Sequence, residues 1–267
     1  MSGCHPFLWY DHGCGSFVLF GPAHLATLAI LVVCAVLIIV LRHRFSPRAR
    51  RILRFGLAGL LLVNEISTHV WHALPHVNQW TVQEMLPLHL CSVFIWLTMV
   101  MLVTRSYRIY EFAYFLGIGG AMQALVTPNH GFGFPHYRFL QAFFAHAPIV
   151  LGAIYMTAVE GYRPTVRSLL RVAVWTNVYL LFVYGVNVVL GSNYMFVNRK
   201  PFSASLLDFL GPWPWYILGM EAVGLVTCLV LYLPFAIADW RAWRKRRKER
   251  GQGNSETGKQ GSPARVQ

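Results

Sequence analysis

The sequence has few charged residues and no metal-binding or redox motif. Asp, Glu, Lys and Arg together make up 12% of its 267 residues, about half the share usual in soluble domains. It contains no Cys-x-x-Cys pair and no His-Glu-x-x-His segment, so no redox dithiol or zinc-protease site is predicted. The five cysteines are scattered, which excludes a disulfide framework. The composition therefore excludes an ordinary soluble domain.

Long apolar runs are what the chain has instead. Hydrophobic residues make up 56% of it, and its mean hydropathy is +0.47. Several runs approach the ~20 residues that a helix needs to cross a bilayer. We predict an all-α, polytopic membrane protein, with a transmembrane domain over residues 1–240 and a basic, disordered cytoplasmic tail over 241–267. The seven predicted transmembrane helices are 22–41, 52–73, 86–104, 109–127, 139–158, 169–190 and 215–238.

The positive charge is unevenly distributed along the chain. Lys and Arg number 23, and 20 of them fall in the first, third and fifth interhelical loops and the C-terminal tail. With seven helices these four regions lie on one side of the membrane. The positive-inside rule makes that side cytoplasmic and places the N-terminus outside. The net charge of +13 therefore indicates topology, and no nucleic-acid partner is predicted.

The histidines are biased in the opposite direction. Ten of the eleven, all but His43, fall on the predicted outer side. Titratable groups within a membrane are costly and mark functional sites, so we predict that several of them converge on one outward-opening cavity. The residues expected there are Glu65, His69 and His72 on one helix face, His89 and Cys91 at the start of the next helix, and Gln123, His146 and Glu221.

Three interpretations of this constellation stay open. It is a structural polar network, a catalytic site with a histidine base and a Cys or Ser nucleophile, or a transition-metal site built on His69-x-x-His72. A proton- or solute-coupled transporter or binding protein would use the same groups. No cofactor and no metal is predicted, and the sequence leaves the oligomeric state open.

Three segments carry a resemblance to a known family. They are Met85–Ser92 (MLPLHLCS), Asn193–Phe196 (NYMF) and Leu210–Tyr216 (LGPWPWY). Together they resemble the YwaF-like bacterial integral membrane proteins, which are similar to the eukaryotic transmembrane-protein-164 group. That group is associated with acyl transfer onto ether phospholipids through a cysteine and a histidine. A more distant similarity is to the androgen-induced membrane hydrolases of lipid esters.

The resemblance implies a lipid acyltransferase or lipid-ester hydrolase in the bacterial inner membrane, with membrane lipids as partners. It implies catalytic roles for Glu65, His89, Cys91 and His146. Leu88 occupies the position of the related cysteine, so we expect Cys91 or Ser92, on the same helix face as Leu88, to replace it. The residues expected to bind substrate are His69, His72, Gln123, Asn193 and Glu221.

Overall fold

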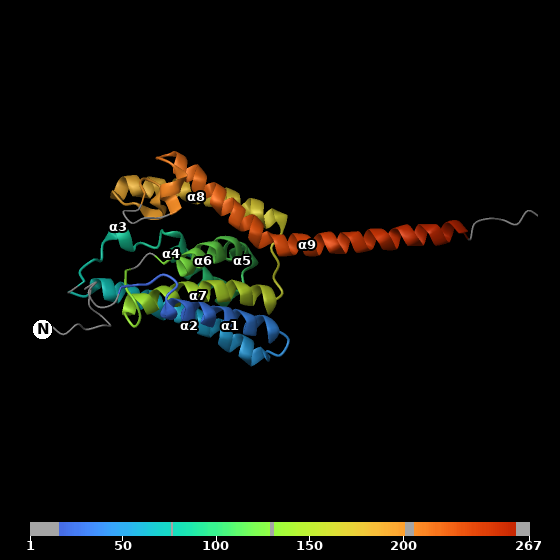
Figure 1. Ribbon diagram of the computed structural model, residues 1–267, viewed down its shortest axis with the longest axis horizontal. Helices are drawn as coiled ribbons and strands as arrows, with labels where there is room; N and C mark the ends of the chain where they lie inside the picture. Colours follow the sequence, from blue (N-terminus) through green and yellow to red (C-terminus); the bar gives the residue numbers. More distant parts are fainter. Residues whose placement is uncertain (1–15, 76, 129–130, 201–205, 260–267) are drawn as a thin grey trace, which may run out of the picture. The chain divides into compact units, whose positions relative to one another are not determined.

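The computed structural model describes the backbone of residues 16–75, 77–128, 131–200 and 206–259, and most of these residues are helical, with no extended strand among them. The all-α prediction is confirmed. The chain divides into two compact units, residues 1–228 and 229–267. The helices, labelled in Figure 1, are α1 (Pro22–Val40), α2 (Pro47–Ala73), α3 (Val82–Met85), α4 (Leu90–Thr104), α5 (Tyr107–Phe112), α6 (Ile118–Val126), α7 (Tyr137–Ala158), α8 (Val166–Leu190) and α9 (Trp215–Lys259), with the π-helical turn η1 (Ala113–Gly117) and the 3-10 turns η2 (Tyr194–Phe196) and η3 (Leu206–Leu210).

Among the residues that the structure describes, five helical segments are long and apolar enough to cross a membrane. They are α1, the continuous run Tyr107–Val126, α7, α8 and Trp215–Arg247 of α9. The 27-residue α2 is long enough for a span but carries Asn64, Glu65, His69 and His72, and α4 has only 15 residues. The chain is therefore a membrane protein with several spans, while the count of seven and the outward N-terminus stay predictions.

The helices begin and end where local chemistry favours it. Ser46 caps α2 by accepting from the backbone N–H of Ala49, and Pro47 follows at the first helical position. Thr165 and Ser168 form a reciprocal capping box at the start of α8. That helix ends at Gly191, whose φ of +66° is the left-handed conformation that glycine adopts without strain.

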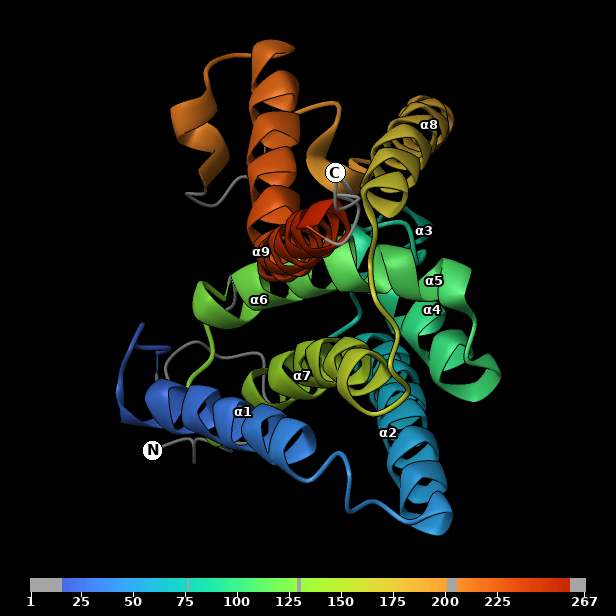
Figure 2. The same cartoon turned by 90° about the vertical axis from the view of Figure 1, so that its right-hand side faces the viewer.

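Within the first unit, α1, α2, α4, α6 and α7 pack side by side, with α7 in contact with the other four (Figure 2). Small residues allow close approach, as is usual between membrane helices. A Cβ atom added at Gly117 would lie 3.2 Å from both Ile149 of α7 and Phe94 of α4, and one at Gly152 would lie 3.0 Å from Thr98. The core of the bundle is therefore the α4–η1–α7 interface.

Contacts at one end of this bundle join three of the arginine-bearing loops. We call it the arginine end. The contacts are Arg54 to the carbonyl of Leu102 (3.1 Å), Arg105 to Glu160 (3.9 Å), the Tyr107 hydroxyl to the carbonyl of Arg163 (2.8 Å), and Arg171 to the buried Glu111 (2.7 Å). The first, third and fifth loops therefore lie together, as the charge pattern predicts.

The opposite end, which we call the histidine end, joins the remaining helix termini. His24 Nε2 lies 2.9 Å from the carbonyl of Leu125, linking the start of α1 to the end of α6. The Ser67 and Tyr137 hydroxyls are hydrogen-bonded at 2.8 Å, linking the end of α2 to the start of α7. His43 lies on the turn between α1 and α2, at the arginine end. Among the described histidines, His24 and His43 thus lie at opposite ends of the bundle.

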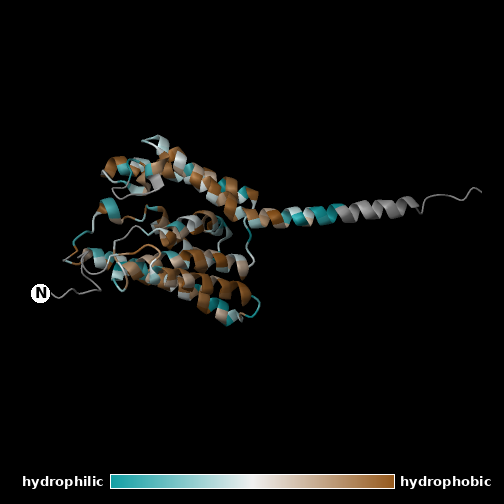
Figure 3. Ribbon diagram, viewed as in Figure 1, coloured by the Kyte–Doolittle hydropathy of each residue, from teal (hydrophilic) through white to brown (hydrophobic). Residues whose placement is uncertain are grey.

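Apolar side chains on α8 and α9 are widely exposed in the isolated chain. Examples are Leu181 at 73%, Val189 at 83% and Val230 at 61% exposure. Such surfaces are expected to contact lipid. Figure 3 shows the hydrophobic colour of α9 giving way to hydrophilic residues along the helix. The backbone is helical through Lys259, whereas a disordered segment was predicted from residue 241.

Candidate functional site

His89 is held at the entrance of α4 by the loop that follows α8. It is the N-cap residue of α4, with extended backbone. Its Nδ1 atom accepts a hydrogen bond of 3.3 Å from the backbone N–H of Met195, and its ring packs against those of Tyr194 and Phe196 at centroid distances of 5.1 and 5.4 Å. An amide N–H can only donate, so neutral His89 carries its proton on Nε2.

Tyr194 fixes this loop against the segment before α4. Its buried hydroxyl donates to the carbonyl of Val82 and accepts from the backbone N–H of Leu86 at 3.0 Å. Burial raises the pKa of this hydroxyl, so it stays protonated and can donate. The side chain of Asn187 in α8 bonds the Tyr194 N–H (2.8 Å) and carbonyl (2.9 Å). His89 is therefore oriented by α8 as well as by its own helix.

His146 in α7 carries its proton on the other ring nitrogen. Its Nδ1 atom lies 2.6 Å from the carbonyl oxygen of Ala142. A carbonyl can only accept, so Nδ1 of neutral His146 is protonated and Nε2 keeps its lone pair. No hydrogen bond to Nε2 of His146 or of His89 is present in the described part of the chain. Nε2 of His146 can therefore act as a base, whereas Nε2 of His89 can donate a hydrogen bond.

Cys91 lies in the first turn of α4 and faces α6. A Cβ atom added at Gly120 would lie 3.9 Å from its Sγ atom and 3.0 Å from Leu90. The tight contact is with Leu90, while 3.9 Å from the thiol is an ordinary van der Waals distance. The Cys91 thiol forms no hydrogen bond with a histidine within the described ranges 77–128 and 131–200.

Cys91 and His146 lie at the same level of the bundle. Phe94, Gly117 and Ile149 meet where α4, η1 and α7 are in contact. Cys91 precedes Phe94 by three residues, Gly120 follows Gly117 by three, and His146 precedes Ile149 by three. Each of these steps leads toward the histidine end. Side chains three apart share a helix face, so Cys91 and His146 each lie about one turn from this contact, on α4 and α7.

Leu88 does not lie on the helix that carries Cys91. The prediction that they share one helix face is wrong, because α4 begins only at Leu90. Pro87 holds the preceding residue Leu86 extended, at ψ 144°. Leu88 packs on the cluster of Leu180, Val183, Tyr194 and Val197, and its carbonyl accepts from the Tyr179 hydroxyl at 2.8 Å. Cys91 therefore faces α6, while Leu88 faces α8.

Glu65 and His69 form a separate pair on α2. The Glu65 carboxylate is buried, lies 3.6 Å from His69 Nε2 and accepts from the Trp96 indole at 3.2 Å. The Trp80 indole donates to His69 Nδ1 at 3.1 Å. Cys91 and Trp96 are five residues apart on α4, or about 140° around the helix. The Glu65–His69 pair and the thiol therefore lie on different sides of α4, and their convergence on one cavity stays a prediction.

The other predicted site residues are dispersed. His72 lies near the end of α2, with Nδ1 2.8 Å from the carbonyl of Thr68. Gln123 is exposed on α6, and Glu221 is partly buried on α9. Asn193 uses its amide within the loop, donating to the carbonyl of Arg199 (2.9 Å) and accepting from its N–H (3.2 Å). Their binding roles stay predictions.

No metal centre is formed by the described residues, since no three His, Cys, Asp or Glu side chains lie where they could hold one ion. His69 is engaged by Glu65 and Trp80, and His72 by the backbone of Thr68. The metal interpretation of His69-x-x-His72 therefore has no geometric support.

The family model of the TMEM164 family matches residues 19–232. This range includes α1 to α8, the His89 loop and the start of α9. The chain belongs to the TMEM164 family. No curated protein and no solved structure matches it. The resemblance expected from the MLPLHLCS, NYMF and LGPWPWY segments is thus confirmed at the level of the TMEM164 family.

Three positions of this TMEM164-family chain matter to the site but were not singled out from the sequence. Asn187 and Tyr194 orient the loop over His89, and Gly120 accommodates Leu90 beside Cys91. Tyr194 lies within the NYMF segment, which was a usable signal. Asn187 is one of two asparagines in the apolar α8, where an amide indicates a hydrogen-bonding role. Nothing in the sequence distinguishes Gly120 from its neighbour Gly119.

Proposed function

We propose that the chain is a lipid acyltransferase of the bacterial inner membrane, with Cys91 as nucleophile, His146 as base and His89 as hydrogen-bond donor. One observation carries the proposal: His146 offers an unprotonated Nε2 and His89 a protonated Nε2. Acyl transfer needs both a base for the nucleophile and a donor for the developing oxyanion.

The proposed reaction has two transfer steps. His146 Nε2 removes the Cys91 proton, and the thiolate attacks the ester carbonyl carbon of a phospholipid. The oxyanion accepts from His89 Nε2–H. The C–O bond then breaks, the lysolipid oxygen takes the proton from His146, and a Cys91 thioester remains. A second lysolipid hydroxyl, deprotonated by His146, attacks that thioester and restores the thiol; water in its place gives hydrolysis.

The thiol and His146 are not hydrogen-bonded in the substrate-free chain. Catalytic hydrogen bonds often become short only when substrate is bound, and both residues lie about one turn from the contact of Phe94, Gly117 and Ile149. Lipid as substrate is supported by the exposed apolar faces of α8 and α9. The proposed topology puts Cys91 and His146 near the outer leaflet.

Acyl exchange in vesicles tests this function. The purified chain is reconstituted with phospholipid and a lysolipid, one of which carries a labelled acyl chain, and label transfer is followed by mass spectrometry. Cys91→Ala and His146→Ala should abolish transfer, and a thioester should be detected on Cys91 of the unaltered protein. Cys34→Ala in α1 and His43→Ala at the arginine end are the matched controls. Equal transfer by Cys91→Ala and the unaltered protein would refute the proposal.

Proton-coupled solute transport is a second candidate function, favoured by the Glu65–His69 pair. A buried carboxylate beside an imidazole, inside a membrane protein, is a typical proton-binding arrangement. This function predicts pH-dependent solute flux in proteoliposomes that Glu65→Gln removes. Flux that is equal in the unaltered protein and Glu65→Gln would contradict it, whatever the result of the acyl-exchange assay.

A further inference from the structure

The basic segment of α9 carries two tryptophans among its cations. Six of the nine residues from 240 to 248 are Lys or Arg, and none is acidic. Every side chain from Arg241 to Arg247 is exposed, and the indoles of Trp240 and Trp243 are 49% and 54% exposed. A topology signal needs only the charges, so the exposed indoles need a separate explanation.

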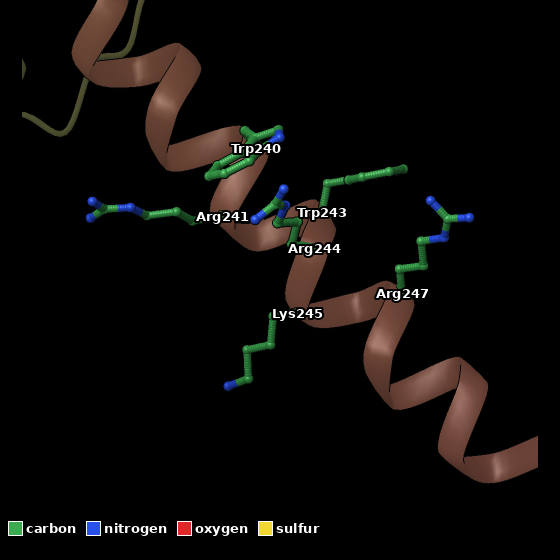
Figure 4. Close-up of a pocket in the computed structure, with 6 residues that line it drawn as sticks. All are labelled: Trp240, Arg241, Trp243, Arg244, Lys245 and Arg247. Carbon is green, nitrogen blue, oxygen red and sulfur yellow. The ribbon is translucent and has the colours of Figure 1, made fainter.

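The arginines and tryptophans are paired along one face of the helix. The guanidinium of Arg244 lies 3.8 Å from the ring centroid of Trp240, and that of Arg247 lies 5.3 Å from that of Trp243 (Figure 4). Positions 240, 243, 244 and 247 share this face through their three- and four-residue spacing. Stacking leaves the planar N–H groups of a guanidinium able to bind an anion. The face therefore presents two oriented anion-binding groups on an aromatic base.

The position of these pairs in the sequence matches a membrane surface. The apolar segment Trp215–Arg247 has 33 residues, more than the ~20 that cross the hydrocarbon layer. Its last turns therefore extend past that layer. Tryptophan favours the level of the headgroups, and clustered Lys and Arg next to a span attract anionic lipids.

We infer that Trp240, Trp243, Arg244 and Arg247 form a binding site for the phosphate of an anionic phospholipid at the cytoplasmic surface. The indoles lie at the headgroup boundary, and the stacked guanidiniums bind phosphate oxygens. Arg241 and Lys245, which line the same surface, add to the positive potential. This site is independent of the proposed acyl transfer.

Lipid retention by the full chain tests the site. The protein is reconstituted in nanodiscs of neutral phosphatidylcholine with anionic phosphatidylglycerol, extracted in mild detergent, and analysed by native mass spectrometry. Each arginine near an anionic surface contributes about fivefold to binding, so Arg244→Gln with Arg247→Gln should reduce retained phosphatidylglycerol by on the order of tenfold. Arg42→Gln with Arg44→Gln, an equal loss of charge on the turn after α1, is the control. Equal retention by the two double variants would overturn the site.

Two further comparisons identify the ligand and the role of stacking. Replacing Trp240 and Trp243 with leucine should weaken retention while every charge is kept; unchanged retention would mean that charge alone binds. Inorganic phosphate or duplex DNA is then added to protein in neutral nanodiscs. Weak binding of both supports a lipid site, whereas DNA binding stronger than that of phosphatidylglycerol would overturn it.

Discussion

The Nδ1 atom of His89 accepts the backbone N–H of Met195, 106 positions later in the chain. This bond places the histidine proton on Nε2. It also makes the orientation of the imidazole depend on the loop after α8, which Tyr194 and Asn187 anchor. The proposed donor role of His89 Nε2 can therefore be separated from the structural role of Nδ1. Substitutions that replace one nitrogen at a time do this.

Replacing His89 with asparagine or with glutamine should have different effects. The Asn oxygen can accept near the position of Nδ1 and keep the Met195 bond, but it leaves no donor at Nε2. The Gln amide can donate near Nε2. Loss of an oxyanion donor costs on the order of 10²-fold in rate, so His89→Asn should lose acyl exchange while His89→Gln keeps more of it.

Thermal unfolding in detergent provides the control for this comparison. His89→Asn should unfold closer to the unaltered protein than His89→Gln does, because it keeps the bond to the loop. The reverse order in activity, with Asn above Gln, would mean that His89 acts only as a support for the loop.

The helices could be predicted from the sequence because apolar runs near 20 residues have few alternatives. The Glu65–His69 pair followed from its four-residue spacing on α2. The single cavity stays a prediction, because spacing along one helix does not give the rotation of its neighbours. Long-range packing decides which side of α4 meets α2 at Trp96 and which side meets α6 at Cys91.

The start of α4 is a second feature that the hydrophobic pattern does not predict. The apolar run predicts one helix over 86–104, although Leu86-Pro87 favours extended backbone. Helix begins only at Leu90. The tautomers of His89 and His146 could not be read from the sequence either, since each depends on which backbone group lies against Nδ1.

Tyr194→Phe should destabilise the loop over His89. The variant loses the donor to Val82 and leaves the backbone N–H of Leu86 without its acceptor. An unsatisfied buried polar group costs about 1–3 kcal/mol, which should lower the melting temperature and the acyl-exchange rate together. Tyr184→Phe, at a 42% exposed position of α8, is the control. A melting temperature equal to that of Tyr184→Phe would show that the hydroxyl does not anchor the loop.

Gly120→Ala should disturb the surroundings of Cys91. The added methyl group would lie 3.0 Å from Leu90 and 3.9 Å from the thiol, and overpacking of this kind costs about 1–3 kcal/mol. Gly185→Ala provides a control in a helix, because nothing lies within 4 Å of its added Cβ atom. We expect reduced stability and acyl exchange for the first variant and neither loss for the second. Unchanged stability and exchange in Gly120→Ala would show that Leu90 makes room for the methyl group without disturbing Cys91.

Glu111→Gln should weaken the attachment of α8 to α5 at the arginine end. The buried carboxylate accepts from the Ser168 hydroxyl and from Arg171 at 2.7 Å. Gln keeps an acceptor oxygen but removes the charge, and Arg171 is 48% exposed, so water can solvate it. We therefore expect the free energy of unfolding to fall by about 1–3 kcal/mol. This is less than the 3–5 kcal/mol typical of breaking a fully buried pair. Unfolding in detergent measures the loss, with Glu84→Gln at an exposed position of α3 as the control. If both variants unfold alike, the Glu111–Arg171 pair does not hold α8 against α5.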